Sequence, residues 1–188
     1  MTKHYLHSIK NLVTAIAVTL FFSCKNDFNE VQKVGVLQSQ PVGEAENIDL
    51  KYTEYKDSTV NLLANLISPE MLDYSNRDFA FSEFPKGIEL KIYDENNNKT
   101  TITSRYAIYY TETGIIDLRD NVVVATHDKD SLFTDQLYYN EKLEWVFTNE
   151  PFYFKQTTGF TKGNGLDSDK SFKNIEVLEM GGDMELDN

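Results

Sequence analysis

The chain has 188 residues, and its 18 Lys and Arg residues against 30 Asp and Glu residues give a net charge of −12. This acidic balance argues against a nucleic-acid-binding protein, which needs a basic surface to neutralise phosphates. A hydrophobic content of 40% and an aromatic content of 13% argue against wholesale disorder. The length predicts one folded domain, or at most two small ones.

The N-terminus has the pattern of a lipoprotein signal peptide. Lys3 and Lys10 give a basic start without acidic residues, and the apolar run Leu12–Phe22 follows. This run is shorter than the roughly 20 residues of a transmembrane helix and fits the apolar part of a secretory signal. It ends at Ser23-Cys24, which resembles the lipobox of bacterial lipoproteins. We therefore expect a signal peptide over residues 1–23 and an acylated Cys24; the alternative is an ordinary buried thiol.

Three further segments are expected after the signal peptide. Residues 24–47 are polar and without a clear period, which predicts a tether between membrane and domain. The alternative is an edge strand supplied by Val31–Leu37. Residues 48–180 form the expected folded domain, and residues 181–188 form an acidic C-terminal tail.

A period of two dominates the sequence after the tether and predicts strands. Ile88, Leu90 and Ile92 alternate with more polar residues, and polar turns separate this run from the next ones. The segment Thr59–Ile67 is the one weak helix candidate and is equally compatible with a strand. Regular alternation of strand and turn over more than 100 residues predicts an all-β sandwich, roll or barrel of antiparallel hairpins.

A weak internal repeat supports stacked hairpins, although chance similarity among hairpins is the alternative. Its offset of 29 residues relates Ile108 to Leu137, Leu137 to Leu166, Ile116 to Trp145, and Leu118 to Phe147.

The sequence offers little that predicts catalysis. A Ser–His or Cys–His catalytic dyad needs a histidine near the nucleophile. Beyond the signal peptide the sequence has only His127, which lies in a polar turn. Cys24 is the only cysteine, so neither an intramolecular disulfide nor a cysteine-built zinc site is expected. Asp128 and Asp130 lack the further ligands of a calcium loop, and no carboxylate pair indicates a glycosidase. We expect no catalytic residue, no metal and no cofactor.

An ordered series of short segments resembles the signature of one family, the LptC family, with its OstA-like lipopolysaccharide-transport domain. The segments are Phe84–Asp94, Ser104–Tyr110, Thr113-Gly114, Leu118, Asn121–Val124, Leu132–Tyr139, Trp145 and Gly163–Leu166. The resemblance covers about Asp49–Val177. It departs from the family at Asp120, where the turn usually has glycine, and at the anchor, since many members carry an N-terminal transmembrane helix.

The resemblance implies an open, twisted β-jelly roll that transports lipid without chemical turnover. Such proteins lie on the periplasmic side of the inner membrane, receive lipopolysaccharide from an ABC transporter and pass it to a bridge protein of the same fold. The apolar inside of the roll would shelter the acyl chains. The departure at the anchor leaves the outer membrane open as an alternative location.

The family resemblance and the alternating pattern together predict a lipid trough lined by one side-chain phase; the alternative is that this phase fills a closed core. The expected lining is Ile88, Leu90, Ile92, Ile102, Ile108, Ile116, Leu118, Val122, Val124, Leu137, Trp145, Phe147, Phe152, Phe154 and Leu166. The family also implies partner docking by strand addition at both end strands. The expected docking positions are Leu50 and Tyr52 for the transporter and Ile175 and Val177 for the bridge.

Two other functional classes are compatible with an exported acidic domain. One is a cell-surface lipoprotein that binds a glycan or a protein. The other is a small lipid-modifying hydrolase, which the shortage of histidines disfavours.

Overall fold

The computed structural model describes residues 40–56 and 58–181. The expected signal peptide, Cys24, most of the tether and all but the first residue of the acidic tail lie outside these residues.

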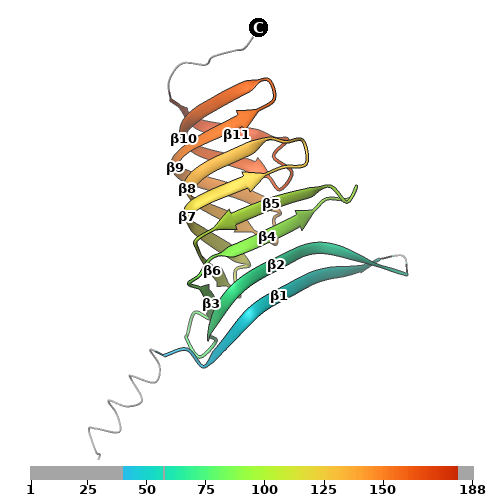
Figure 1. The fold of residues 1–188 in the computed structure, drawn as a ribbon, viewed down its shortest axis with the longest axis vertical. Coiled ribbons are helices and arrows are strands. Elements are labelled where there is room, and N and C mark those ends of the chain that lie inside the picture. The colour runs from blue at the N-terminus through green and yellow to red at the C-terminus, as the bar shows by residue number, and fades with distance from the viewer. Residues whose placement is uncertain (1–39, 57, 182–188) are drawn as a thin grey trace, which may run out of the picture. The chain divides into compact units, whose positions relative to one another are not determined.

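Eleven antiparallel strands form one sheet in the described part of the chain (Figure 1). They are β1 (Gly43–Lys56), β2 (Thr59–Tyr74), β3 (Phe81–Phe84), β4 (Ile88–Tyr93), β5 (Lys99–Ser104), β6 (Tyr106–Tyr110), β7 (Ile115–Ala125), β8 (Ser131–Asn140), β9 (Trp145–Gln156), β10 (Gly159–Asp169) and β11 (Ile175–Met180). The all-β prediction is confirmed, and Thr59–Ile67 is a strand. Residues 43–47, which we expected in the tether, belong instead to β1.

The sheet folds over into a roll because two long strands each pair with two neighbours on one side. Strand β2 pairs with β4 through Ala64–Ile67 and with β3 through Leu72–Tyr74. Strand β7 pairs with β6 through Ile115–Arg119 and with β5 through Val123–Ala125. The path β7–β5–β4–β2–β3–β6 therefore returns to β7 and encloses an interior between two walls, which is the expected jelly-roll architecture.

The two walls share the long strands. Wall A consists of β4, β5 and residues 122–125, 131–134, 152–156 and 159–164; wall B consists of β3, β6 and residues 115–119, 136–140, 145–148 and 166–169. Register shifts between Arg119 and Val122, Thr134 and Tyr138, and Asn164 and Leu166 lie where the strands pass between the walls. Bulges of this kind bend a strand and increase its twist.

Gly87 is required where the β3–β4 turn meets the corner between β5 and β6. Its φ is +81°, and a Cβ at this position would clash with the Ser104 carbonyl oxygen and lie 2.9 Å from Arg105 Cα. Only glycine adopts this conformation without strain and leaves room for the neighbouring backbone.

The interior is filled by one phase of side chains, and the sequence assigned most of that phase correctly. Twelve of the fifteen expected positions are buried: Ile88, Leu90, Ile92, Ile102, Ile116, Leu118, Val122, Val124, Leu137, Phe152, Phe154 and Leu166. The orientation expected for Ile108, Trp145 and Phe147 is wrong. Their neighbours Ala107 and Val146 are buried in their place, because successive side chains in a strand point to opposite faces.

The internal repeat explains two of these three errors. Buried positions of β8 recur in β10 at an offset of 29, as in Leu137 and Leu166, but buried positions of β7 recur in β9 at an offset of 30, as in Ile116 and Val146. Applying 29 throughout shifts β9 by one residue and exchanges its faces. The third error, at Ile108, arises because the chain changes strand at Arg105, which resets the alternation.

Candidate functional site

An apolar cavity of about 370 Å³ is lined by the β1–β2 hairpin, by β4 of wall A and by strands of wall B. Its deep surface is formed by Leu66, Phe84, Leu90, Ile92 and Ile116, all 1–6% exposed. Side chains of Leu50, Leu63 and Met71 complete the apolar surface on the side of the hairpin. A space of this kind accommodates part of an apolar chain.

Three of the expected trough residues, Leu90, Ile92 and Ile116, line this cavity. Farther along the roll, Leu118 and Leu137 are 0% exposed and pack within the core. Trp145 instead lines a wider, more polar opening of about 1040 Å³, together with Tyr93 and Leu143. The open part of the interior is thus at the N-terminal end of the roll, and contact of any of these residues with lipid stays a prediction.

The rim of the cavity is polar. Tyr109 donates a hydrogen bond of 2.9 Å to Glu141 Oε2, and Tyr52 of β1 lies close enough to interact with Tyr109. Burial and the bond to Glu141 raise the pKa of Tyr109. Lys170 donates to Glu144 Oε1 at 2.6 Å on the same rim. An apolar base under a polar rim suits an amphipathic ligand.

Tyr109 is a cavity residue that sequence reasoning missed. It lies on the inner phase of β6 with Ala107, and it pairs with Ser82 of β3 and Ile116 of β7. Arg105 could have indicated this orientation from the sequence. It is a charged, exposed residue that interrupts the alternating run, and the residues that face the interior change from even to odd positions after it. The cavity residues Leu66, Met71 and Phe84 were also missed, since their strands show no simple alternation.

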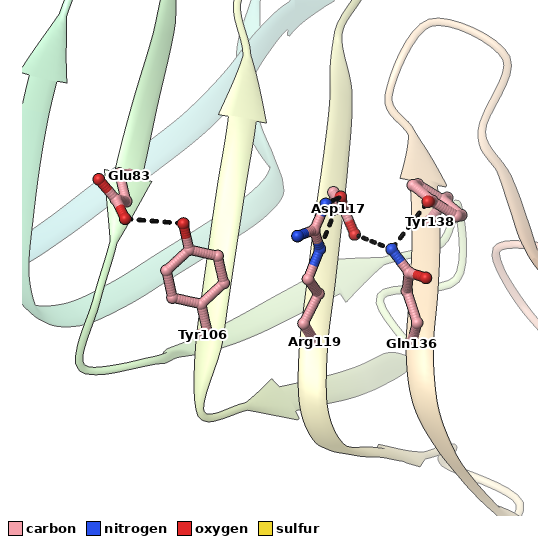
Figure 2. Close-up of polar contacts among 6 residues, drawn as sticks. All are labelled: Glu83, Tyr106, Asp117, Arg119, Gln136 and Tyr138. Carbon is pink, nitrogen blue, oxygen red and sulfur yellow. Dashed lines mark hydrogen bonds and ion pairs between the residues drawn. The ribbon is translucent and has the colours of Figure 1, made fainter. Parts of the chain in front are cut away.

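A polar network lies on the outer face of wall B (Figure 2), and none of its six residues lines the cavity. Asp117 is only 2% exposed although it points outward, because Arg119 and Gln136 cover it. Arg119 Nε donates to Asp117 Oδ2 at 3.0 Å, and Gln136 Nε2 donates to Asp117 Oδ1 at 2.7 Å. The bond from Arg119 to Asp117 raises the pKa of Arg119. The network joins β7 to β8 and holds the wall together.

The same outer face links β6 to β3. The Tyr106 hydroxyl donates to Glu83 Oε1 at 2.7 Å, as Figure 2 shows. Burial, followed by this bond, raises the pKa of Tyr106. Gln136 Nε2 also donates to the Tyr138 hydroxyl at 2.7 Å within β8, so these side-chain contacts join β3 to β6 and β7 to β8.

The expected docking segments lie in β1 and β11, the terminal strands of the sheet. In the described residues β1 pairs only with β2, and β11 only with β10. Leu50 is 39% exposed, whereas Ile175 and Val177 pack against the core. Tyr52 lines the cavity.

The register determines which backbone groups of β11 remain open. Gly181 N donates to Lys162 O at 3.1 Å, so residues two, four and six positions before Gly181 also direct their N–H groups to β10. Ile175 and Val177 are among these. The N–H groups of Glu176 and Leu178 point away from β10, toward a potential partner strand.

Over residues 40–56 and 58–181, no helix is long and apolar enough to cross a membrane. In the same residues, no group of three or more His, Cys, Asp or Glu side chains is placed to hold a metal ion.

Comparison with known proteins identifies the family. A family model described as lipopolysaccharide-assembly, LptC-related, matches residues 12–180. No curated protein matches the chain. The match spans most of the sequence, and the described residues form the β-jelly roll that the resemblance implies. Members of this family are membrane-associated periplasmic components of lipopolysaccharide transport. The chain belongs to the LptC-related family of lipopolysaccharide-assembly proteins.

Proposed function

We propose that this protein is a relay in lipopolysaccharide export. It takes lipopolysaccharide from an inner-membrane ABC transporter and passes it to a periplasmic bridge protein of the same fold. The observation that carries the proposal is the cavity of about 370 Å³, whose apolar base and polar rim match the two halves of an amphipathic lipid. Family membership adds the lipopolysaccharide class of ligand.

In this proposal, lipid enters the roll at its N-terminal end, where the cavity lies. The cavity lies beside β1, the terminal strand that we assign to the transporter, and the packed part of the roll extends from it toward β11. An acyl chain lies against Leu66, Leu90 and Ile92, while Tyr109 and Lys170 at the rim face the polar headgroup. Burial of the chain gains about 0.8 kcal/mol per CH₂ group.

Transfer in this proposal needs no chemical step on the lipid. The protein binds lipopolysaccharide and releases it chemically unchanged. ATP hydrolysis by the transporter drives the movement of lipopolysaccharide toward the bridge protein. The anchor is an acylated Cys24, which holds the protein at the periplasmic face of the inner membrane. The mass of the processed N-terminal peptide tests this anchor, because an unmodified Cys24 thiol contradicts it.

The two terminal strands serve as docking edges. Unpaired strand edges normally carry a risk of aggregation, and strand addition by a partner satisfies their backbone groups. The transporter docks at the edge of β1, which includes Leu50 and Tyr52, and the bridge docks at β11, which includes Ile175 and Val177.

Depletion of the protein in its native cells tests the proposed function. Newly made lipopolysaccharide is then expected to accumulate at the inner membrane, and a plasmid copy of the gene restores export. A depleted strain that exports lipopolysaccharide at the normal rate contradicts the relay and favours a surface lipoprotein that binds a glycan or a protein.

A further inference from the structure

The polar opening of about 1040 Å³ adjoins the apolar cavity. It is bordered by the end of the β1–β2 hairpin, the β4–β5 turn, the β8–β9 turn and the start of the β10–β11 loop. Leu63, Glu144 and Lys170 line both the opening and the cavity. The polar part of a ligand whose apolar chain fills the cavity therefore reaches the opening.

The opening contains uncharged hydrogen-bonding side chains whose capacity is unused. Within residues 40–56 and 58–181, the side chains of Trp145, Asn61 and Asn96 make no hydrogen bond. The half-buried Trp145 ring also stacks on no other ring in this part of the chain. Leu143, which is 72% exposed, lines the same opening. An apolar surface and several uncharged polar groups are thus available to a ligand.

Two aspartates of the opening are instead occupied by their own loops. Asp94 accepts hydrogen bonds from the backbone N–H groups of Asn96 at 2.9 Å and of Asn98 at 2.8 Å. Asp169 accepts one from the backbone N–H group of Ser171 at 2.9 Å. These bonds hold the β4–β5 turn and the β10–β11 loop in place, so the borders of the opening are already formed without a ligand.

The charge of the opening selects against anions. Its lining carries five carboxylates and two lysines, and one of these lysines, Lys170, is paired with Glu144 at 2.6 Å. The excess of negative charge repels a phosphate or carboxylate group. A neutral sugar meets no such repulsion. Its hydroxyls both donate and accept hydrogen bonds, as amide side chains do, and the C–H face of its ring packs on an aromatic ring.

We propose that the polar opening binds an uncharged saccharide, with one sugar ring on the face of Trp145 and hydroxyls bonded to Asn61 and Asn96. The inference rests on the proposed function, because the saccharide belongs to a glycolipid whose acyl chain occupies the adjoining cavity. The protein then recognises the glycolipid through its sugar as well as through its apolar chain.

Tryptophan fluorescence of the full chain tests this proposal, since Trp145 is the only tryptophan in the sequence. Dodecyl maltoside below its micelle concentration supplies a sugar and an apolar chain. Dodecyl tetraethylene glycol ether has the same chain without a sugar, and maltose is the sugar without a chain. The maltoside is expected to shift Trp145 emission to shorter wavelength and, in calorimetry, to bind about three- to ten-fold more tightly than the ether. The ether should bind without the shift, and maltose should bind much more weakly than the maltoside.

The three probes separate failure of this inference from failure of the proposed function. Equal affinity for maltoside and ether, or bound maltoside without an emission shift, contradicts the saccharide site and leaves the lipid cavity in place. Equal affinity for maltose and maltoside indicates a free glycan and contradicts the link to the cavity. If neither the maltoside nor the ether binds, the lipid cavity of the proposed function fails, and the glycolipid inference fails with it.

Substitutions at the two amides test the assigned contacts. Asn61→Ala and Asn96→Ala are each expected to weaken maltoside binding about two- to ten-fold and to leave ether binding unchanged. Both side chains are exposed, so the fold should persist. Asn164→Ala is the matched control, because Asn164 is an exposed asparagine of β10 outside the opening. Unchanged maltoside binding in both amide variants, or an equal loss in the control, contradicts these contacts.

Discussion

The Tyr109 hydroxyl donates a 2.9 Å hydrogen bond to Glu141 Oε2 and thereby ties β6 to the turn between β8 and β9 at the cavity rim. Both residues line the cavity, so the bond fixes one side of its opening. The bond therefore matters both for the stability of the roll and for the shape of the entrance.

Removing this bond is expected to cost stability in a pH-dependent way. Tyr109→Phe should lower the free energy of unfolding by about 1–2 kcal/mol at pH 7, because the acceptor is a carboxylate. The pKa of Tyr109 is raised in the folded state, so its contribution is present below the ordinary tyrosine pKa of about 10 and declines as the pH rises above it. Urea denaturation at neutral and alkaline pH measures both effects. A difference between wild type and variant that widens above pH ~10 contradicts this assignment.

Alanine substitutions at one inner and one outer position test the side-chain orientation. Leu137→Ala should cost about 2–5 kcal/mol, because Leu137 is 0% exposed and its removal leaves a cavity. Ile108→Ala should cost about 1 kcal/mol or less, because Ile108 lies on the outer face between Glu83 and Asp117. Denaturant unfolding of both variants gives the comparison, and equal losses argue against the assigned faces.

Alternation predicted the fold better than it predicted the site. Within one uninterrupted strand, such as Ile88–Tyr93, a period of two determines which side chains face the core. The orientation failed at Ile108 and Phe147, where a strand change and a one-residue difference in repeat length reversed the faces. These features depend on bulges and corners, which the hydrophobic pattern of a single strand does not contain.

The cavity itself was beyond prediction from sequence. Its lining comes from β1, β2, β3, β4, β6, β7, β8 and three turns, and their proximity arises from the closure of the roll. The pattern of apolar residues is the same whether the interior is packed, as at Leu118, or open, as at Leu90.

Asp169 is expected to be the main stabilising residue of the β10–β11 loop. Its carboxylate accepts hydrogen bonds from backbone N–H groups of Ser171, Lys173 and Asn174. The loop holds Phe172, which is 4% exposed at a φ of +57°, inside the core. Asp169→Asn should therefore lower the free energy of unfolding by about 1–3 kcal/mol at pH 7.

Lowering the pH should remove the stabilisation that the Asp169 carboxylate gives to the wild-type protein. Burial raises the pKa of Asp169, but bonds from Ser171, Lys173 and Asn174 outweigh it and leave the pKa lowered. A lowered folded pKa gives stability that is present above the ordinary value of about 3.9 and is lost as the pH falls through the folded pKa. Thermal unfolding at pH 7 and pH 3 should show the two proteins converging in acid. A constant difference at both pH values is inconsistent with an ionised Asp169 as the acceptor.

A proline on the open side of β11 tests bridge docking. Glu176→Pro removes an N–H group that points away from β10, so it should weaken strand addition by a partner while the β10–β11 pairing persists. Glu176→Ala changes the same side chain and should bind normally. Co-purification with the bridge protein measures the effect. Normal recovery with the proline variant would exclude this edge as the docking site.

The most direct measurement of the central claim compares two adjacent residues. A photo-crosslinking amino acid replaces either Tyr109, which lines the cavity, or Ile108, which points to the outer face. In cells with an active transporter, the crosslinker at position 109 is predicted to capture lipopolysaccharide, and the one at position 108 to capture little. Equal capture at both positions, or no capture at position 109, would contradict the account of this cavity as the lipid site.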